Sequence, residues 1–251
     1  MMVRLGVGAA CAVLAALASR RLGWLDPGGA WTAALVGTAV FGFAGWAGAV
    51  PLLAFFSTSS LLGRLPGRPG GRVHQARSAR QVLANGGVAA LAAMIYALSG
   101  QRWAWGALVG SLAAANADTW STELGMRSRQ APRHLWVGPR VPAGTSGGVT
   151  PAGLCAGVAG ALLIVVCGYV AHVPWWAPLV GGVGGTAVDT LAGGTLQVQY
   201  RCAACGRTVE AARHACPGPV AVVRGWPWLE NDAVNFLATV AGALAAAVLI
   251  R

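Results

Sequence analysis

Three carboxylate side chains stand inside stretches of the sequence that are otherwise apolar. Asp118 and Glu123 fall in the segment 116–125, and Asp189 falls in the segment 184–193. A carboxylate within a lipid bilayer is costly unless it is hydrated, paired or bound to a metal ion, so such a residue indicates function by default. A buried ion pair or a polar lock between helices is the structural alternative. The sequence favours a functional site.

These acids have the chemistry of magnesium ligands. Mg²⁺ prefers hard oxygen donors, usually keeps several waters, and bridges carboxylates to substrate phosphates. Asp118 and Asp189 each precede a threonine, and both lie toward the predicted cytoplasmic ends of their spans. We therefore expect Asp118, Glu123 and Asp189 to bind Mg²⁺, with Asn116 and Asp232 in support. Asp232 begins the last apolar run, where stabilisation of the helix dipole is an equally simple role.

A second group of residues has the chemistry of a phosphate-binding site. Arg77, Gln81 and Asn85 recur at helical spacing along one stripe, with Arg80 beside them. Backbone N–H groups of a turn rich in Gly, Ser and Thr before a helix can bind phosphate oxygens. With the acids, this pattern indicates a metal–phosphate site at the membrane surface. The predicted phosphate-binding residues beyond the stripe are Arg140, Gly144, Thr145, Ser146, Gly147, Gly148 and Asn235.

Three cysteines and one histidine lie close together near the end of the sequence. Cys202 and Cys205 form a Cys-x-x-Cys pair, and His214 and Cys216 follow it. Three thiolates and one imidazole suit tetrahedral Zn²⁺, so we expect a structural zinc site. A redox-active pair, or cysteines without any ligand, are the alternatives.

The composition shows which elements must position these residues. Of the 251 residues, 56% are apolar and 10% are charged, whereas soluble domains average about 25% charged residues. Continuous apolar runs of about 20 residues fit transmembrane helices and not barrel strands, which would alternate. We therefore predict an all-α, polytopic helix bundle in one domain, 1–251, with a Cys/His loop at 199–229. The predicted spans are 3–19, 30–50, 51–63, 82–99, 103–124, 148–171, 174–198 and 231–250.

Two features of these spans leave alternatives. The short run after Pro51 makes 30–63 either a tight hairpin or one long bent element. Glycine pairs near Asp189 either allow close helix packing or let the helix unwind around a ligand.

The distribution of arginine predicts the topology. The formal net charge is +11, and there is no lysine. Fifteen of the 18 basic residues fall in four loops, 20–29, 64–81, 125–147 and 199–230, that share one side if the chain crosses eight times. The positive-inside rule makes those loops cytoplasmic and puts both termini outside a cell (inner) membrane, with the first run retained as a helix and not cleaved. The bilayer is thus the expected partner, and nucleic acid is not.

The motifs resemble, in their order, the integral membrane family catalogued as domain of unknown function 92, the transmembrane protein 19 family. The resemblance covers nearly the whole chain, with Glu230 and Thr190 standing where the family would have Asp and Ser. The matching stretches are Arg80-Gln-Val-Leu-Ala-Asn-Gly-Gly87, Ala115-Asn-Ala-Asp-Thr-Trp-Ser-Thr-Glu-Leu-Gly125, Gly144-Thr-Ser-Gly-Gly-Val149, Val188-Asp-Thr-Leu-Ala-Gly-Gly-Thr-Leu-Gln197, Cys202 to Gly206, and Gly225-Trp-Pro-Trp-Leu-Glu-Asn-Asp-Ala-Val-Asn235.

The resemblance also implies an activity. A plant and cyanobacterial branch of that family is known as phytyl-phosphate kinase. It implies transfer of a phosphoryl group from a nucleoside triphosphate, such as CTP, to a membrane-dissolved isoprenoid monophosphate. An ion-coupled secondary transporter is the main alternative, because intramembrane acids and glycine-rich helices also describe such carriers. A non-catalytic scaffold organised by the zinc loop is a third.

Overall fold

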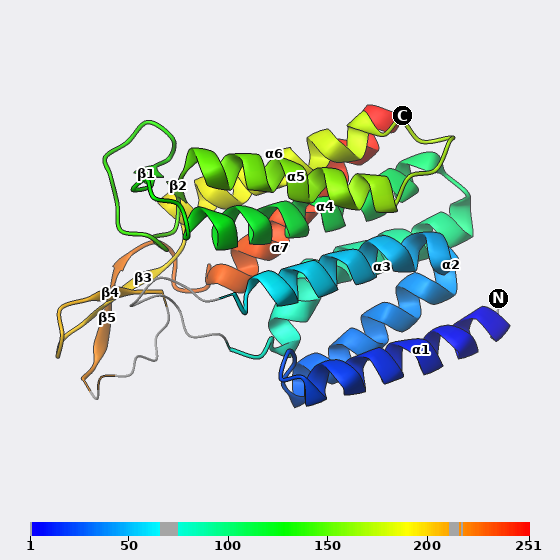
Figure 1. Cartoon of the computed structure of the whole chain (residues 1–251), viewed down its shortest axis with the longest axis horizontal. Helices are drawn as coiled ribbons and strands as arrows, with labels where there is room; N and C mark the ends of the chain where they lie inside the picture. Colours follow the sequence, from blue (N-terminus) through cyan, green and yellow to red (C-terminus); the bar gives the residue numbers. More distant parts are fainter. Residues whose placement is uncertain (1, 66–74, 211–215, 217) are drawn as a thin grey trace.

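The computed structural model describes residues 2–65, 75–210, 216 and 218–251. Its described residues form a helical bundle with two small sheets at one end (Figure 1). The helices are α1 (Met2–Arg21), α2 (Pro27–Leu62), α3 (Ala79–Ser99), α4 (Arg102–Gly125), α5 (Pro151–Cys167), α6 (Trp176–Thr195) and α7 (Asn231–Ile250). The predicted helical class is therefore correct, and the start and end of α7 match the predicted span.

The 36 residues of α2 form a hairpin. A straight helix of that length would extend about 54 Å. The ring of Trp24, before α2, nevertheless lies 5.8 Å from the ring of Phe56, near its end. The chain reverses at Gly45, whose φ of 64° and ψ of −156° are non-helical. The break expected at Pro51 was wrong in position, because Pro51 lies inside the second half of α2. The reversal occurs at Gly45 because it needs a backbone conformation that only glycine adopts readily.

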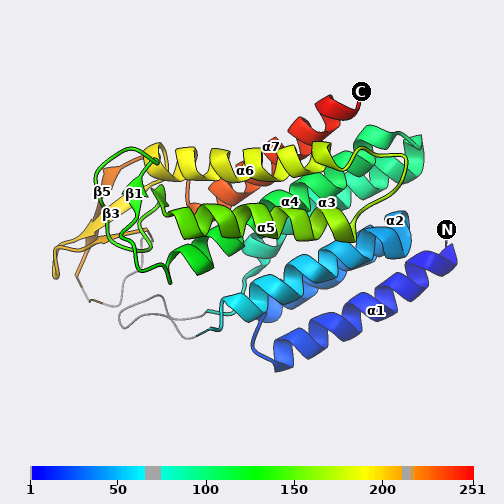
Figure 2. The ribbon, with the colours of Figure 1, turned by 45° about the horizontal axis from the view of Figure 1, so that its top comes forward.

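The chain ends and the sheets lie at opposite ends of the bundle (Figures 1 and 2). The described parts of the arginine-rich loops lie at the end with the sheets, and their place on one side of a membrane stays a prediction. Four helices, α1, α2, α3 and α7, are long and apolar enough to cross a membrane, and α5 is a shorter apolar helix. The number of crossings and the face toward the cytoplasm stay predictions.

Helix α4 is the centre of the bundle. Its fourteen residues from Ala104 to Ala117 are all buried, and it contacts α2, α3, α5, α6 and α7. Small residues permit these contacts: a Cβ atom at Gly242 of α7 would lie 2.8 Å from both the Ala114 Cβ and the Gly110 carbonyl oxygen of α4. Backbones that approach this closely are typical of membrane bundles, where the association of helices depends on packing.

The loops contain short strands that the sequence did not predict. Strand β1 (Arg133–His134) pairs antiparallel with β2 (Gly148–Val149), and β3 (Gln199–Cys202) lies between β4 (Thr208–Val209) and β5 (Val220–Arg224). Strands of two to five residues are too short to show an alternating pattern. The all-α description therefore holds for the bundle, while the predicted Cys/His loop contains a three-stranded antiparallel sheet.

Replacing Gly45 with alanine should destabilise the protein through the backbone alone. A Cβ atom there would meet nothing within 4 Å, but the positive φ is strained for any other residue. We expect Gly45→Ala to lower the free energy of unfolding by about 1–3 kcal/mol, measured by thermal unfolding in detergent with tryptophan fluorescence. Gly6→Ala is the matched control, since Gly6 lies within α1 with equally open surroundings. Equal stability of the two variants would contradict the hairpin at Gly45.

Candidate functional site

One pocket brings the predicted acids and the glycine-rich turn together. Its volume is about 360 Å³, and it lies where α4 and α6 end and α5 begins. Asp118, Glu123 and Asp189 line it, as do all five residues from Gly144 to Gly148. Residues separated by about 70 positions in the sequence thus share one cavity, as the motifs suggested.

Asp118 of α4 and Asp189 of α6 face each other across this pocket. Their carboxyl groups lie within hydrogen-bonding reach of one another. Among the described residues, the buried Oδ2 atom of Asp189 has no hydrogen-bond partner. The hydroxyls of Thr119 and Thr190, which follow the two acids in the sequence, donate instead to carbonyls four residues earlier in their own helices. Two carboxylates this close are not both ionised unless a cation lies with them.

Glycine packing puts the two acids opposite each other. A Cβ atom at Gly185 of α6 would lie 2.5 Å from the Ala114 Cβ of α4. Asp118 and Asp189 each follow this contact by four residues, which is about one helical turn on either helix. Helix α6 is unbroken through this region, and its glycines allow the close packing of α4 and α6. Unwinding around a ligand stays a prediction.

The glycine-rich turn packs against the end of α6 and leads into α5. Gly147 has a φ of +78°, and a Cβ atom there would lie 2.4 Å from the Gly194 Cα. The N–H groups of Thr145 and Gly148 donate to Pro142 and Thr145 carbonyls within the turn. Two residues further on, the Thr150 hydroxyl caps α5 by accepting from Gly153 N–H at 3.0 Å. The turn thus forms a wall of the pocket, and the positive end of the α5 dipole faces it.

The structure adds two residues that sequence reasoning missed. Glu210, directly after β4, accepts hydrogen bonds from Ser146 N–H at 3.2 Å and from the Ser146 hydroxyl, and it interacts electrostatically with Asp189. Gln197 lines the pocket and is 1% exposed, and its Nε2 group has no partner among the described residues. Glu210 is one of only seven acidic residues, and that scarcity was its signal in the sequence.

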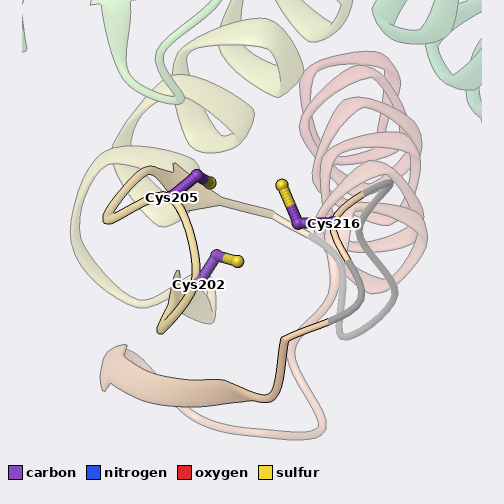
Figure 3. Close-up of side chains that lie close together, drawn as sticks. All are labelled: Cys202, Cys205 and Cys216. Carbon is purple, nitrogen blue, oxygen red and sulfur yellow. The ribbon is translucent and has the colours of Figure 1, made fainter.

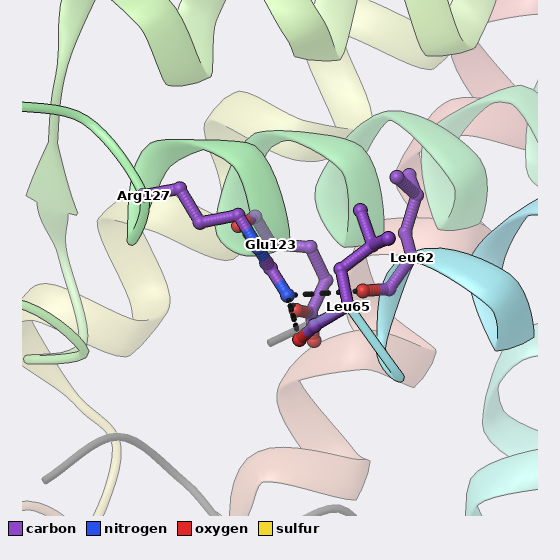
Figure 4. A network of polar contacts seen from close by, with 4 residues as sticks. All are labelled: Leu62, Leu65, Glu123 and Arg127. Carbon is purple, nitrogen blue, oxygen red and sulfur yellow. Dashed lines mark hydrogen bonds and ion pairs between the residues drawn. The ribbon is translucent and has the colours of Figure 1, made fainter. Parts of the chain in front are cut away.

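Glu123 lines the pocket and also belongs to a network that ties α4 to α2 (Figure 4). Its carboxylate lies 2.9 Å from Arg127 Nη1. Arg127 Nη2 donates to the carbonyl oxygens of Leu62 at 3.2 Å and Leu65 at 2.6 Å, at the end of α2. This pairing gives Glu123 a structural role, and its predicted part in metal binding stays a prediction.

The predicted stripe on α3 lies beside a different cavity. Arg77, Gln81 and Asn85 line a pocket of about 100 Å³ between α1, α2 and α3. The Arg77 guanidinium lies 5.6 Å from the Phe55 ring centroid, and burial lowers the pKa of Arg77 to about 10, against which the Glu123 carboxylate raises it. Gln81 completes a capping box with Ser78, and Asn85 donates to the Gln81 carbonyl. These residues therefore organise the start of α3, outside the main pocket.

The remaining predicted residues do not line the pocket. Asn116 is buried, where its amide donates to the Gly160 carbonyl at 2.8 Å and so joins α4 to α5. Arg80 is exposed beside Glu230, at 3.5 Å. Asp232 and Asn235 lie in the first turns of α7, and Arg140 is exposed. Asn231, the first residue of α7, does line the pocket.

Comparison with known proteins assigns the chain to a family. The chain belongs to the family described as integral membrane protein DUF92, whose profile it matches over residues 10–243. This confirms the family that the motifs suggested.

Three relatives show how far the similarity extends. An uncharacterized membrane protein of Methanocaldococcus jannaschii is 34% identical over 76% of this chain and 83% of its own length. An uncharacterized membrane protein of Synechocystis is 28% identical over 92% of this chain and 83% of its own. Protein PGR of Arabidopsis thaliana is 31% identical over 53% of this chain and 50% of its own. No solved structure matches at a significant level.

The Arg127 network should contribute measurably to stability. Arg127→Gln removes hydrogen bonds to two carbonyls and leaves Glu123 without its ionic partner. We expect the free energy of unfolding to fall by about 2 kcal/mol, measured by thermal unfolding in detergent. Arg129→Gln, two residues further and exposed, is the control and should be near neutral. If Arg129→Gln were as destabilising as Arg127→Gln, the network would not be what holds α4 to α2.

Proposed function

We propose that this protein is a Mg²⁺-dependent kinase of the membrane. It transfers a phosphoryl group from a nucleoside triphosphate, such as CTP, to an isoprenoid monophosphate and so forms the diphosphate. The observation that carries this proposal is the shared pocket of Asp118, Asp189 and the glycine-rich turn. The kinase branch of the family that the motifs resemble supports the same reaction class.

The acidic pair has the features of a magnesium site. Asp189 Oδ2 is buried without a protein partner among the described residues, and the Asp118 carboxyl faces the same space. Bound Mg²⁺ would neutralise charge on the phosphates of the substrates. Asp118 and Asp189 would hold it directly or through water, with Glu123 and Glu210 at the edge of the site.

Other pocket residues offer donors to phosphate oxygens. The Gln197 amide is buried and has no partner on its Nε2 group among the described residues. The first turn of α5, after Thr150, and the start of α7, at Asn231, turn positive helix ends toward the pocket. The acceptor is already a phosphate, so no strong general base is required. Positioning and charge neutralisation then supply most of the catalysis.

The outer wall of the pocket suits a lipid chain. Leu154 and Val158 of α5 and Val183 of α6 line the pocket, and their side chains are 45%, 47% and 39% exposed. A phosphate in the polar part of the pocket therefore has an apolar surface beside it that continues onto the lipid-facing side of the bundle. An isoprenoid tail would lie along this surface while its phosphate meets the acids.

Unbroken helices at the two acids support phosphate chemistry over transport. Asp118 precedes the end of α4 by seven residues, and Asp189 precedes the end of α6 by six. Both therefore lie about 10 Å from the ends of their helices and about 5–7 Å from the helix midpoints, so their depth alone does not separate the two functions. Substrate sites of secondary transporters are expected near the middle of the bilayer, usually at unwound helices. Here both helices remain continuous at the acids.

Asp118→Asn and Asp189→Asn should each abolish the kinase reaction. Purified protein in detergent would be incubated with Mg²⁺, one of CTP, ATP, GTP or UTP, and phytyl or geranylgeranyl monophosphate, and the diphosphate followed by mass spectrometry. Loss of a metal ligand should reduce the rate at least about 100-fold. Asp26→Asn is the matched control: Asp26 caps α2 outside the pocket, and asparagine caps a helix as well as aspartate does.

Two outcomes would contradict the proposal. Full activity in both folded pocket variants would exclude the acidic pair as the catalytic site. An absence of diphosphate with every donor, from wild-type protein that is folded and monodisperse, would exclude the kinase. Flux measurements in proteoliposomes would then test the transporter.

A larger side chain in the apolar wall of the pocket should weaken binding of the lipid substrate but not of the nucleotide. We expect Val158→Trp to raise the KM for isoprenoid phosphate about tenfold or more, with little change in the KM for the nucleotide. Leu162→Trp is the matched control, because Leu162 lies one turn further along the same exposed face of α5 without lining the pocket. The same KM shift in both variants, or a shift only for the nucleotide, would place the lipid elsewhere.

A further inference from the structure

Three thiols meet at the tip of the sheet formed by β3, β4 and β5. The sulfur atoms of Cys202, Cys205 and Cys216 all lie within 4.8 Å of one another (Figure 3). Cys202 ends β3, Cys205 lies in the turn that follows, and Cys216 comes from the segment before β5. The cluster therefore joins two parts of the loop between α6 and α7.

The backbone around these cysteines forms a tight turn. Gly206 N–H donates to the Cys202 carbonyl at 2.8 Å, and Cys202 N–H donates to the Arg207 carbonyl at 3.0 Å. Gly206 has a φ of +68°, which favours glycine at this position. Ala203 N–H donates to the Pro219 carbonyl at 2.9 Å and so holds the Cys216 segment beside the turn. Backbone hydrogen bonds thus hold the segments that carry the three thiols close together.

We propose that Cys202, Cys205 and Cys216 bind a structural Zn²⁺ ion. Thiolates at the usual Zn–S distance of about 2.3 Å stand about 3.8 Å apart in a tetrahedral site. The observed spacing of up to 4.8 Å needs only a small contraction. A disulfide would use two of the thiols and leave the third without a role. His214, expected as the fourth ligand, lies outside the described residues.

The zinc would fix the position of Glu210, a consequence that rests on the proposed function. Strand β4 leaves the Cys205 turn and pairs with β3 through Thr208 and Val209, and Glu210 follows immediately. Glu210 then accepts the hydrogen bonds of Ser146 in the glycine-rich turn. A metal that holds the turn therefore holds one wall of the pocket. In this account Glu210 is a positioning residue.

Metal analysis of purified full-length protein tests the zinc site without any assay of activity. We expect about one Zn²⁺ per chain by inductively coupled plasma mass spectrometry, lost in the double variant with Cys202→Ser and Cys205→Ser. Cys155→Ser, an exposed thiol on α5, is the matched control and should keep the zinc. Zinc retained in the double variant would overturn the proposal.

A second measurement keeps the zinc proposal testable if the double variant fails to fold. Wild-type protein expressed with Co²⁺ should show thiolate-to-cobalt charge-transfer absorption. Absence of that absorption in folded protein, or a disulfide between two of the three cysteines by mass spectrometry, would overturn it.

Glu210→Gln separates the positioning role from zinc binding. We expect this variant to keep its zinc but to raise the KM for a phosphate substrate between about 10- and 100-fold, as zinc removal should. Normal kinetics in Glu210→Gln would refute the positioning role and leave the metal site intact. If the protein had no kinase activity, the metal analysis would be unaffected. A failure of the proposed function is therefore distinguishable from a failure of the zinc proposal.

Discussion

The rest of this structure depends on two carboxyl groups that face each other inside an apolar bundle. Asp118 and Asp189 lie too close for both to carry a charge unless a cation is present, and the nearby threonine hydroxyls are already bonded to their own helices. Burial of ionisable side chains within a membrane protein costs free energy. Such residues therefore usually have a function. In the proposed function, a divalent cation with phosphate ligands would neutralise both carboxyl groups at once.

The surrounding fold keeps this pair in place. The buried length of α4 forms a rigid axis, and the small residues of α6 and α7 pack directly against it. Asn116 links α4 to α5, and Arg127, just after the C-terminal end of α4, links that end to α2. The pocket thus lies between helices whose separation is fixed by close backbone contact. Such rigidity is what the proposed phosphoryl transfer would require of its site.

Much of this arrangement could be predicted from the sequence because it depends on polar residues that are rare within apolar segments. An acid within an apolar run is conspicuous, so Asp118 and Asp189 were found, and the structure brings them to the pocket formed by Gly144 to Gly148. Their role as metal ligands stays a prediction. The start of α7 at Asn231 was found because the apolar run has a sharp polar boundary there.

Other features depend on contacts that sequence patterns do not contain. The helical stripe of Arg77, Gln81 and Asn85 lies beside a second cavity and not in the main pocket, a separation that helical spacing does not reveal. Its part in phosphate binding stays a prediction. Glu210 reaches the glycine-rich turn only because the β3–β4 hairpin folds back, and two-residue strands leave no periodic signal. The reversal at Gly45 was assigned to Pro51 because proline is the more familiar helix breaker.

The most direct test of the central claim is Mn²⁺ binding by electron paramagnetic resonance, with Mn²⁺ as the probe for the magnesium site. Purified wild-type protein should bind one Mn²⁺ ion that Mg²⁺ displaces, and either Asp118→Asn or Asp189→Asn should weaken that binding strongly. The double variant should be little weaker than each single one, because both side chains serve the same ion. Undiminished Mn²⁺ binding in both single variants would contradict a shared metal site between α4 and α6.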